Sequence, residues 1–193
     1  MINISNFRGP IVQIELRQGS LLEAKDLDII VNAANCKMRG GGGLDGAVHD
    51  AAGPNLLEKL KELAPYGSPT SHPVVTDGFE TGFKKIIHTP GPVWADGVSG
   101  ERIALRATYD YALDAANAIC KNKNYKSVGF GSISTGIFGF PLDLAMPIAL
   151  GAVSEWVRVA QNVYFNKIVF VMYGEEEYNK YKTAFDAIKA WNP

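Results

Sequence analysis

Two glycine-rich segments hold the residues whose types and spacing suit chemistry on a ligand. They are GGGGLDG, residues 40–46, and STGIFG, residues 134–139. Glycine lets backbone amides approach a ligand closely, and successive amides ahead of a helix N-terminus form an anion-binding concavity. Two such loops at one edge of a sheet predict a ligand that carries phosphate, such as a diphosphate. The alternative is that the glycines only make tight turns.

The first glycine segment departs from the common nucleotide-binding motifs. Gly41, Gly43 and Gly46 fit G-x-G-x-x-G. The dinucleotide fingerprint, however, directly follows its first strand and has an acidic residue about 20 positions later. Here the segment NAANCKMRG intervenes, and Glu62 lies inside a predicted helix. No G-K-[ST] follows, so an ATP-hydrolysing P-loop is excluded.

Strands and helices are expected to alternate along the chain, and each glycine segment follows a strand. The β-branched run at residues 29–31 predicts a central strand covered on both faces. Gly53 is expected to stop a short helix, and Pro54 to open the next. Strands are expected at residues 10–18, 27–35, 74–79, 84–89, 126–133 and 167–173, and helices at residues 44–53, 54–64, 103–122 and 175–188.

One further helix is expected after the second glycine segment. Asp143 is predicted as its N-cap, which would place Pro147 in the first turn, where amides lack internal acceptors. The glutamates at 175–177 are interpreted as complementing the N-terminus of the last helix. The buried stripe of the helix after Asp143 is expected to comprise Ala149, Val153, Trp156 and Ala160.

This alternation predicts the fold class and the place of the site. We expect an α/β fold, a three-layer α/β/α sandwich with a mostly parallel, mixed central sheet, in a single domain spanning residues 1–193. In such folds ligands sit outside the carboxyl ends of the strands. Both glycine segments should therefore lie at that edge of the sheet.

Composition narrows the class of protein further. The formal net charge of −1 and the absence of a basic patch argue against nucleic acid as a partner. Cys36 and Cys120 lie far apart, so neither a disulfide framework nor a thiolate metal site is expected, and a reducing cytoplasm fits. The N-terminus lacks the apolar segment of a signal peptide, and no segment has the roughly 18 apolar residues of a membrane span. The three histidines are scattered, so no metal is expected.

Three ordered motifs run through nearly the whole chain. They are DIIVNAAN with GGGGLDGAVHDAAG, then KKIIHTPGPVW, then SISTGIFGFP. Together they resemble the macrodomain family, and within it the MacroD-type ADP-ribosyl hydrolases. The resemblance implies a macrodomain-like fold, a cleft for ADP-ribose, ADP-ribosylated proteins as partners and no cofactor.

The resemblance implies roles for residues of both glycine segments. Asn35 should hydrogen-bond the distal ribose, and Asp45 should sit beside that ribose and the catalytic water. Asparagine offers a donor and an acceptor to a vicinal diol, and a carboxylate near a C1 linkage orients or deprotonates water. Phe138 should pack against the distal ribose, and Tyr173 should stack on adenine. The other expected ADP-ribose-binding residues are Ser20, Leu21, Ala33, Gly42, Gly43, Leu44, Ser134, Thr135, Gly136 and Ile137.

Three of these residues also have purely structural interpretations. Asn35 would cap a turn, Asp45 would be the N-cap of the short helix, and Tyr173 would belong to the core. Taken singly, Asp45 and Tyr173 fit the structural interpretation better. Only the joint pattern of motifs favours the functional one.

Two positions depart from the family pattern. Macrodomains usually have G-D-I before the central strand, and its aspartate accepts a hydrogen bond from the adenine amino group. Here Ser20 replaces that aspartate and accepts without charge. MacroD-type hydrolases tend to have G-D-A at residues 71–73, where this chain has Ser71-His72-Pro73. One interpretation is that this loop serves a different ADP-ribose acceptor in the substrate. The other, which is favoured, is that His72 is exposed polar surface.

Three functions from different classes remain. The leading one is an enzyme that removes mono-ADP-ribose from modified proteins, with an Asp or Glu ester linkage expected, or deacetylates O-acetyl-ADP-ribose through the same water. The second is a non-catalytic ADP-ribose reader. A Rossmann-type oxidoreductase ranks third. Asp45 separates the first two, because a reader has no need of a carboxylate there.

Overall fold

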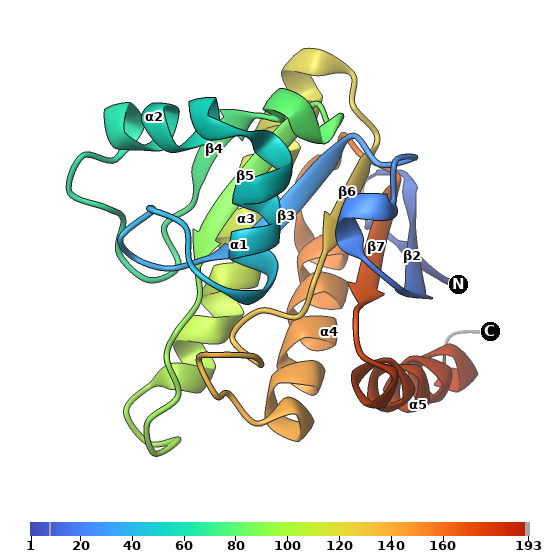
Figure 1. The fold of residues 1–193 in the computed structure, drawn as a ribbon. Helices are drawn as coiled ribbons and strands as arrows, with labels where there is room; N and C mark the ends of the chain where they lie inside the picture. The colour runs from blue at the N-terminus through green and yellow to red at the C-terminus, as the bar shows by residue number, and fades with distance from the viewer. Residues whose placement is uncertain (8, 192–193) are drawn as a thin grey trace.

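A computed structural model describes residues 1–7 and 9–191 of the chain and shows a seven-stranded mixed sheet (Figure 1). The strand order is β1-β2-β7-β6-β3-β5-β4. The five inner strands run parallel, and the edge strands β1 and β4 run antiparallel to their neighbours. The strands are β1 (Ile2–Ser5), β2 (Ile11–Gln18), β3 (Ile29–Ala34), β4 (Val74–Asp77), β5 (Lys85–Pro90), β6 (Ser127–Phe130) and β7 (Lys167–Met172).

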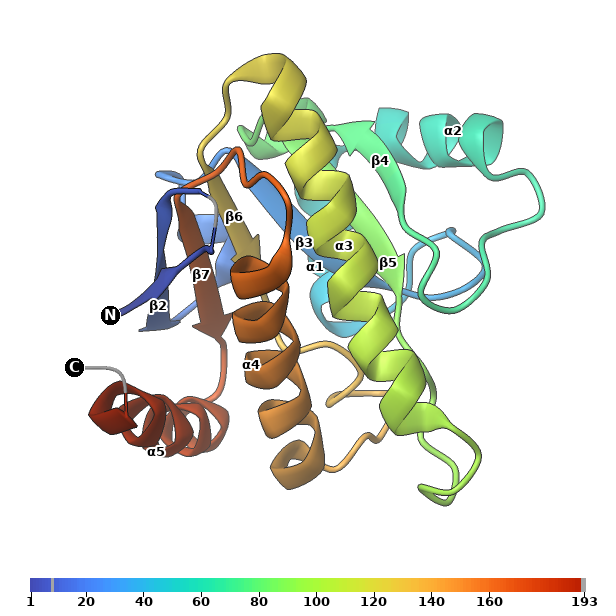
Figure 2. The same cartoon turned by 180° about the vertical axis from the view of Figure 1, so that it is seen from behind.

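Helices cover both faces of this sheet. On one face lie the short 3-10 helix η1 (Leu21–Glu23), α1 (Gly43–Ala52) and α2 (Pro54–Leu63) (Figure 1). The other face carries α3 (Glu101–Lys123), α4 (Leu142–Val159) and α5 (Glu175–Trp191), of which α3 and α4 lie foremost in Figure 2. The predicted three-layer α/β/α fold with a mostly parallel mixed sheet is confirmed.

The core explains why the first three residues of the central strand β3 are all apolar. Ile29 and Val31 face the layer of α3, α4 and α5, whereas Ile30 between them faces α1 and α2. All three side chains are fully buried, because successive residues of a strand point to opposite faces and both faces are covered. The prediction of a central strand at residues 29–31 is confirmed.

The parallel strands bring distant loops to one edge. The carboxyl ends of β3, β6 and β7 lie side by side, as the pairings of Val31 with Phe130 and of Phe130 with Phe170 show. The loops that follow these strands therefore meet there, as predicted for both glycine segments. Figure 1 shows the arrowheads of β6 and β7 pointing to this edge.

The structure corrects the predicted start of α4. The helix begins at Leu142, and its first hydrogen bonds run from the amides of Leu144 and Ala145 to the carbonyl of Pro141, which is the N-cap. Asp143 therefore lies in the first turn and is not the N-cap. Pro147 lies inside the helix rather than in its first turn, so it removes one internal hydrogen bond.

Two strand predictions differ from the structure in extent. The strand expected at residues 74–79 ends at Asp77, because residues 79–81 form the 3-10 helix η2 (Phe79–Thr81). The strand expected at residues 126–133 ends at Phe130, and the following residues turn into the second glycine segment. The edge strand β1 was not predicted from the sequence.

Candidate functional site

Two adjoining hollows form a cleft at the carboxyl edge of the sheet. The first, of about 220 Å³, lies between the two glycine loops, and the second, of about 470 Å³, lies between η1 and the end of β7. They share Gly43, Leu44, Ser132 and Gly136, so they form one continuous cleft. The first hollow is lined by Ala33, Asn35, Gly42, Gly43, Leu44, Asp45, Ser134, Gly136, Ile137 and Phe138, and the second by Ser20, Leu21, Gly43, Leu44, Thr135, Gly136 and Tyr173, among others. Every predicted site residue lines this cleft.

The first glycine loop leads directly into α1. Gly43 opens the helix with a φ of 61°, in the left-handed region that glycine adopts without strain. The amides of residues 41–45 donate to no acceptor in the described part of the chain. Because the first amides of a helix have no internal partner, they are available to an anion in the first hollow.

The second glycine loop is held in a turn that also leaves amides free. Phe140 donates to the carbonyl of Ser134 at 3.0 Å, and Trp94 donates to that of Phe138 at 2.9 Å. The amides of residues 135–138 donate to no described residue. This loop faces the first one closely, since a Cβ on Gly42 would lie 2.8 Å from the Cδ1 of Ile137. Two sets of free amides therefore border the same hollow.

Asp45 supplies the carboxylate of the first hollow from the first turn of α1. Its Oδ1 accepts from Asn32 Nδ2 at 2.7 Å, and its Oδ2 accepts from Asn35 Nδ2 at 3.1 Å. Its side chain bonds to asparagines, and the N-cap of α1 is Gly42, so the N-cap interpretation of Asp45 is wrong. Burial raises the pKa of the Asp45 carboxyl, whereas the bond from Asn32 and the charge of His49 oppose that rise.

A buried polar row continues behind this carboxylate. Asn32 on β3 pairs with His88 on β5, and its Nδ2 lies 3.1 Å from the Nδ1 of His88. The Nε2 of His88 lies 3.0 Å from Thr76 Oγ1 on β4. Burial lowers the pKa of His88 to about 3, and the charge of His49 adds to the effect. His88 is therefore neutral and supports Asn32 from behind.

Asn35 combines a structural and a site role. Its Oδ1 accepts from the amide of Lys37 at 3.0 Å, so Asn35 caps a turn, which was the structural alternative for this residue in the sequence analysis. Its Nδ2 donates to the carbonyl of Gly40 at 2.8 Å and to Asp45. The side chain thus ties the start of the glycine loop to the carboxylate while lining the first hollow.

The second hollow is bordered by an aromatic ring and a hydroxyl. Tyr173 follows β7 and is 83% exposed, so its interpretation as a core residue is wrong. Ser20, which lines the same hollow, is the N-cap of η1, and its Oγ accepts from the amide of Leu22 at 3.3 Å. The exposed ring of Tyr173 offers a nucleotide base a flat surface on which to stack.

Comparisons with known proteins show the family to which the chain belongs. A family model described as Macro domain matches residues 31–149. The chain belongs to the macrodomain family. A relative named O-acetyl-ADP-ribose deacetylase, from Escherichia fergusonii, is 40% identical over 88% of this chain and 93% of its own.

Solved macrodomain structures superpose on the whole fold. The Oceanobacillus iheyensis macrodomain with ADP is 31% identical, with a TM-score of 0.80 over 97% of this chain and 95% of its own. The Trypanosoma brucei macrodomain in complex with ADP-ribose is 33% identical, with a TM-score of 0.76 over 89% of this chain and 68% of its own.

The departure of this macrodomain at residues 71–73 lies away from the cleft. Ser71 adopts a φ of 68°, and its Oγ bonds to the carbonyl of Ala104 and to Thr108, which fixes the loop to α3. His72 is exposed, with its ring 6.0 Å from that of Tyr111, and lines neither hollow. The interpretation of His72 as exposed polar surface therefore fits the structure better.

Sequence reasoning missed several polar residues of this macrodomain's site. The spacing of His49 four residues after Asp45 on one helix was a usable signal, because such residues share a face; its Nε2 lies 3.7 Å from Asp45 Oδ1. Asn32 and His88 had no local signal, since strand pairing alone brings them together. Glu177 was assigned only to the helix N-terminus, yet it lines the second hollow.

The described part of the macrodomain offers no obvious metal centre or membrane segment. No three His, Cys, Asp or Glu side chains in it cluster in a way that could hold a metal ion. None of its helices is both long and apolar enough to span a bilayer.

Proposed function

We propose that this macrodomain binds ADP-ribose and hydrolyses it from mono-ADP-ribosylated proteins at Asp or Glu ester linkages, or deacetylates O-acetyl-ADP-ribose. The observation that carries the proposal is Asp45, a buried carboxylate bonded by two asparagine amides beside the free amides of two loops. The ADP and ADP-ribose named for the two solved relatives support the ligand. The name of the Escherichia fergusonii relative supports the deacetylase reaction.

The proposed binding mode assigns one part of the ligand to each part of the cleft. The diphosphate accepts from the free amides of residues 41–45 and 135–138, because an anion is favoured where helix and turn amides converge. The base stacks on Tyr173 in the second hollow. The distal ribose then lies at the far end of the first hollow, against Phe138 and Asn35.

The proposed chemistry uses Asp45 as a general base. A water beside the distal ribose gives a proton to Asp45, and its oxygen bonds to C1 of that ribose while the C1–O bond breaks and the Asp or Glu side chain leaves as a carboxylate. In deacetylation the same water attacks the acetyl carbonyl carbon, and the ribose oxygen takes up the proton from Asp45 as the acetate leaves. A raised pKa suits this role, since a base works best when its pKa approaches the working pH. Asn35 positions the ribose hydroxyls for the attack.

Binding and turnover test the proposal separately. Calorimetry should show that ADP-ribose binds and that adenosine alone binds far more weakly, because adenosine lacks the diphosphate. Incubation should release ADP-ribose from a substrate modified through glutamate, or acetate from O-acetyl-ADP-ribose, and substrates modified through serine or arginine test whether other linkages are cleaved. Binding without any release would replace the enzyme by a non-catalytic reader, and equal affinity for adenosine would contradict the diphosphate assignment.

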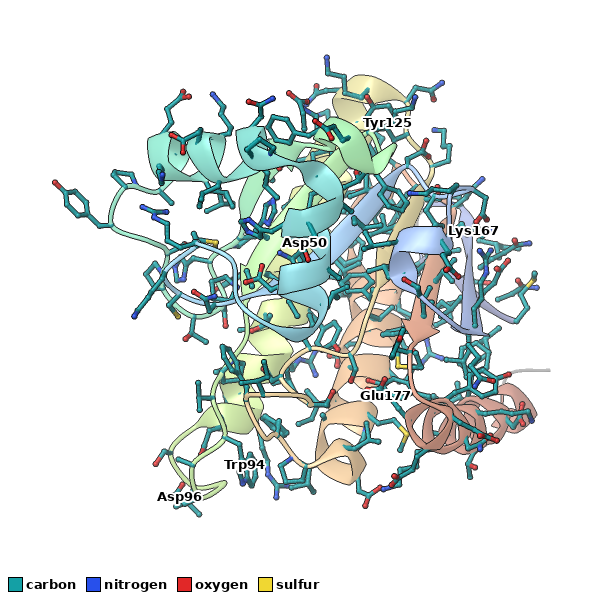
Figure 3. The ribbon with its side chains drawn as sticks, in the orientation of Figure 1. Asp50, Trp94, Asp96, Tyr125, Lys167 and Glu177 are labelled. Carbon is teal, nitrogen blue, oxygen red and sulfur yellow. The ribbon has the colours of Figure 1, made fainter. Side chains whose placement is uncertain are left out.

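Variants at the carboxylate test the mechanism. Asp45→Ala should lower turnover of a glutamate-linked substrate by ~10²–10⁴ while changing ADP-ribose affinity much less. Asn35→Ala should impair both, because a misplaced ribose loses contacts and attack geometry together. Asp50→Ala is the matched control, since Asp50 is an exposed carboxylate on the same helix (Figure 3).

A further inference from the structure

Glu177 is a polar residue of the cleft that the binding mode above does not use. It lies in the first turn of α5, shortly after Tyr173, and lines the second hollow together with Thr135 and Gly136. Figure 3 shows it at the end of α5 nearest the loop that follows β6. A carboxylate in this position borders the second hollow as well as the helix N-terminus.

Only one of the two carboxylate oxygens of Glu177 has a hydrogen-bond partner in the described part of the chain. Thr135 Oγ1 donates to Glu177 Oε1 at 3.2 Å and also lies 2.8 Å from Ser132 Oγ. The second oxygen, Oε2, has no hydrogen-bond or ion-pair partner in the described part of the chain. The neighbouring Glu176 differs, because it points to solvent and pairs with Lys180 at 3.3 Å. Glu177 therefore lines the hollow with one carboxylate oxygen available as a hydrogen-bond acceptor.

The position of Glu177 along the cleft identifies the part of the ligand that it faces. Gly136 belongs to both hollows and marks the diphosphate end of the second one. Tyr173 marks the base end. Glu177 lies between these two ends, because it bonds to Thr135, the residue before Gly136, and follows Tyr173 by four residues at the start of α5. In a nucleoside diphosphate, the group between diphosphate and base is a ribose.

We propose that Glu177 accepts hydrogen bonds from the 2′ and 3′ hydroxyls of the ribose that carries the base, and that it excludes ligands phosphorylated on that ribose. This inference rests on the proposed binding of ADP-ribose. A carboxylate has acceptor sites for both hydroxyl donors of a vicinal diol. Dinucleotide-binding folds use an acidic residue in the same way, on the ribose 2′ hydroxyl.

A phosphate on the ribose would reverse the interaction. The 2′ phosphoryl group replaces a hydroxyl donor by acceptor oxygens that carry negative charge. Like charges brought together at an interface repel each other, and the described residues place no lysine or arginine in ion-pair range of Glu177 to offset the repulsion. The cleft should therefore favour ADP-ribose over 2′-phospho-ADP-ribose.

Calorimetry with these two ligands tests the inference. The wild type should bind ADP-ribose at least ~100-fold more tightly than 2′-phospho-ADP-ribose. Glu177→Gln should narrow this ratio by ~10-fold or more, because the amide removes the charge and can donate to phosphate. Glu176→Gln, the matched control, should leave the ratio unchanged. Glu177→Asp keeps the charge and should keep the discrimination.

The outcomes separate this inference from the proposed function. If the wild type binds neither ligand, the proposed function fails and the inference fails with it. If the wild type binds ADP-ribose but binds the phosphorylated ligand equally well, only the inference is overturned. An unchanged ratio in Glu177→Gln also overturns it. Because both ligands are measured on each variant, a partly unfolded variant alters the active fraction but leaves the ratio of affinities interpretable.

Discussion

Asn32 and Asp45 meet at 2.7 Å in the interior, where the amide of a strand residue donates to the carboxylate of a helix residue. Asn32 is fully buried and in turn contacts His88. The carboxylate is therefore aimed at the first hollow by a side chain that does not itself line the hollow. This bond also favours the ionised form of Asp45 against the effect of burial.

The acidic limb of the pH profile of kcat/KM should depend on the hydrogen bond from Asn32 to Asp45. Because burial raises the pKa of Asp45, kcat/KM is expected to fall at a pH above the ordinary aspartate value. Asn32→Leu removes the donor, so the limb should move further to higher pH. The pH dependence of kcat/KM for a glutamate-linked substrate measures the position of the limb in the wild type and its shift in Asn32→Leu. Asp50→Asn is the control. A limb that stays in place in Asn32→Leu would contradict this assignment.

The contact between Gly42 and Ile137 predicts a substitution that weakens ADP-ribose binding with little effect on the free energy of unfolding. A Cβ on Gly42 would lie 2.8 Å from Ile137 Cδ1, and Ile137 is 78% exposed and free to move. Gly42→Ala should change the free energy of unfolding by less than about 1 kcal/mol. It should weaken ADP-ribose binding about tenfold, because Ile137 is displaced over the cleft. Adding Ile137→Ala should restore most of the affinity, and no restoration would count against the contact.

His88 predicts a pH dependence of folding stability. Its pKa is about 3 in the folded chain and about 6.5 when unfolded, so only the unfolded chain takes up this proton between these values. The free energy of unfolding should therefore fall as pH drops below about 6.5, by up to about 1.4 kcal/mol per pH unit from this group. His88→Gln should lose this component in denaturant titrations from pH 7 to 4. His72→Gln is the control for removing an exposed imidazole, and identical slopes in wild type and His88→Gln would refute the assignment.

Ser20 predicts a gain of affinity on substitution. If its hydroxyl faces the adenine amino group, Ser20→Asp should tighten ADP-ribose binding by up to ~1–2 kcal/mol, because charge-assisted hydrogen bonds are stronger than neutral ones. Aspartate also serves as an N-cap, so η1 should persist. The analogue with hypoxanthine in place of adenine has no amino group and should show no gain. Weaker binding of ADP-ribose by the variant would mean that the base sits elsewhere.

Local sequence patterns were sufficient to predict most of the helices and strands and the edge of the sheet that carries the site. The run Ile29–Val31 and the helical spacing after residue 101 follow from burial on one or two faces, which each segment encodes by itself. The two glycine segments follow strands in the chain, and parallel strands bring such loops to one edge. Site residues carried on these loops, such as Asn35 and Asp45, could thus be placed in one cleft from the sequence.

The start of α4 shows where local reasoning fails. Aspartate is a favoured N-cap, so Asp143 was the expected N-cap of α4. In the structure the carbonyl of Pro141 accepts the first helical amides, and the helix begins one residue before Asp143. The chain path out of the second glycine loop therefore decides the boundary, and the residue preference does not.

Only the tertiary structure decided which side chains support the site. Asn32 meets His88 because β3 and β5 pair in one particular register, and a shift of one residue would turn the two side chains to opposite faces. Glu177 meets Thr135 across 42 positions of the chain because α5 packs against the loop after β6. Such contacts depend on how whole elements pack, whereas the strand, helix and loop patterns depend on neighbours in the chain. The sequence by itself therefore determined the fold and the loops that carry the cleft, and packing determined the residues that position its carboxylates.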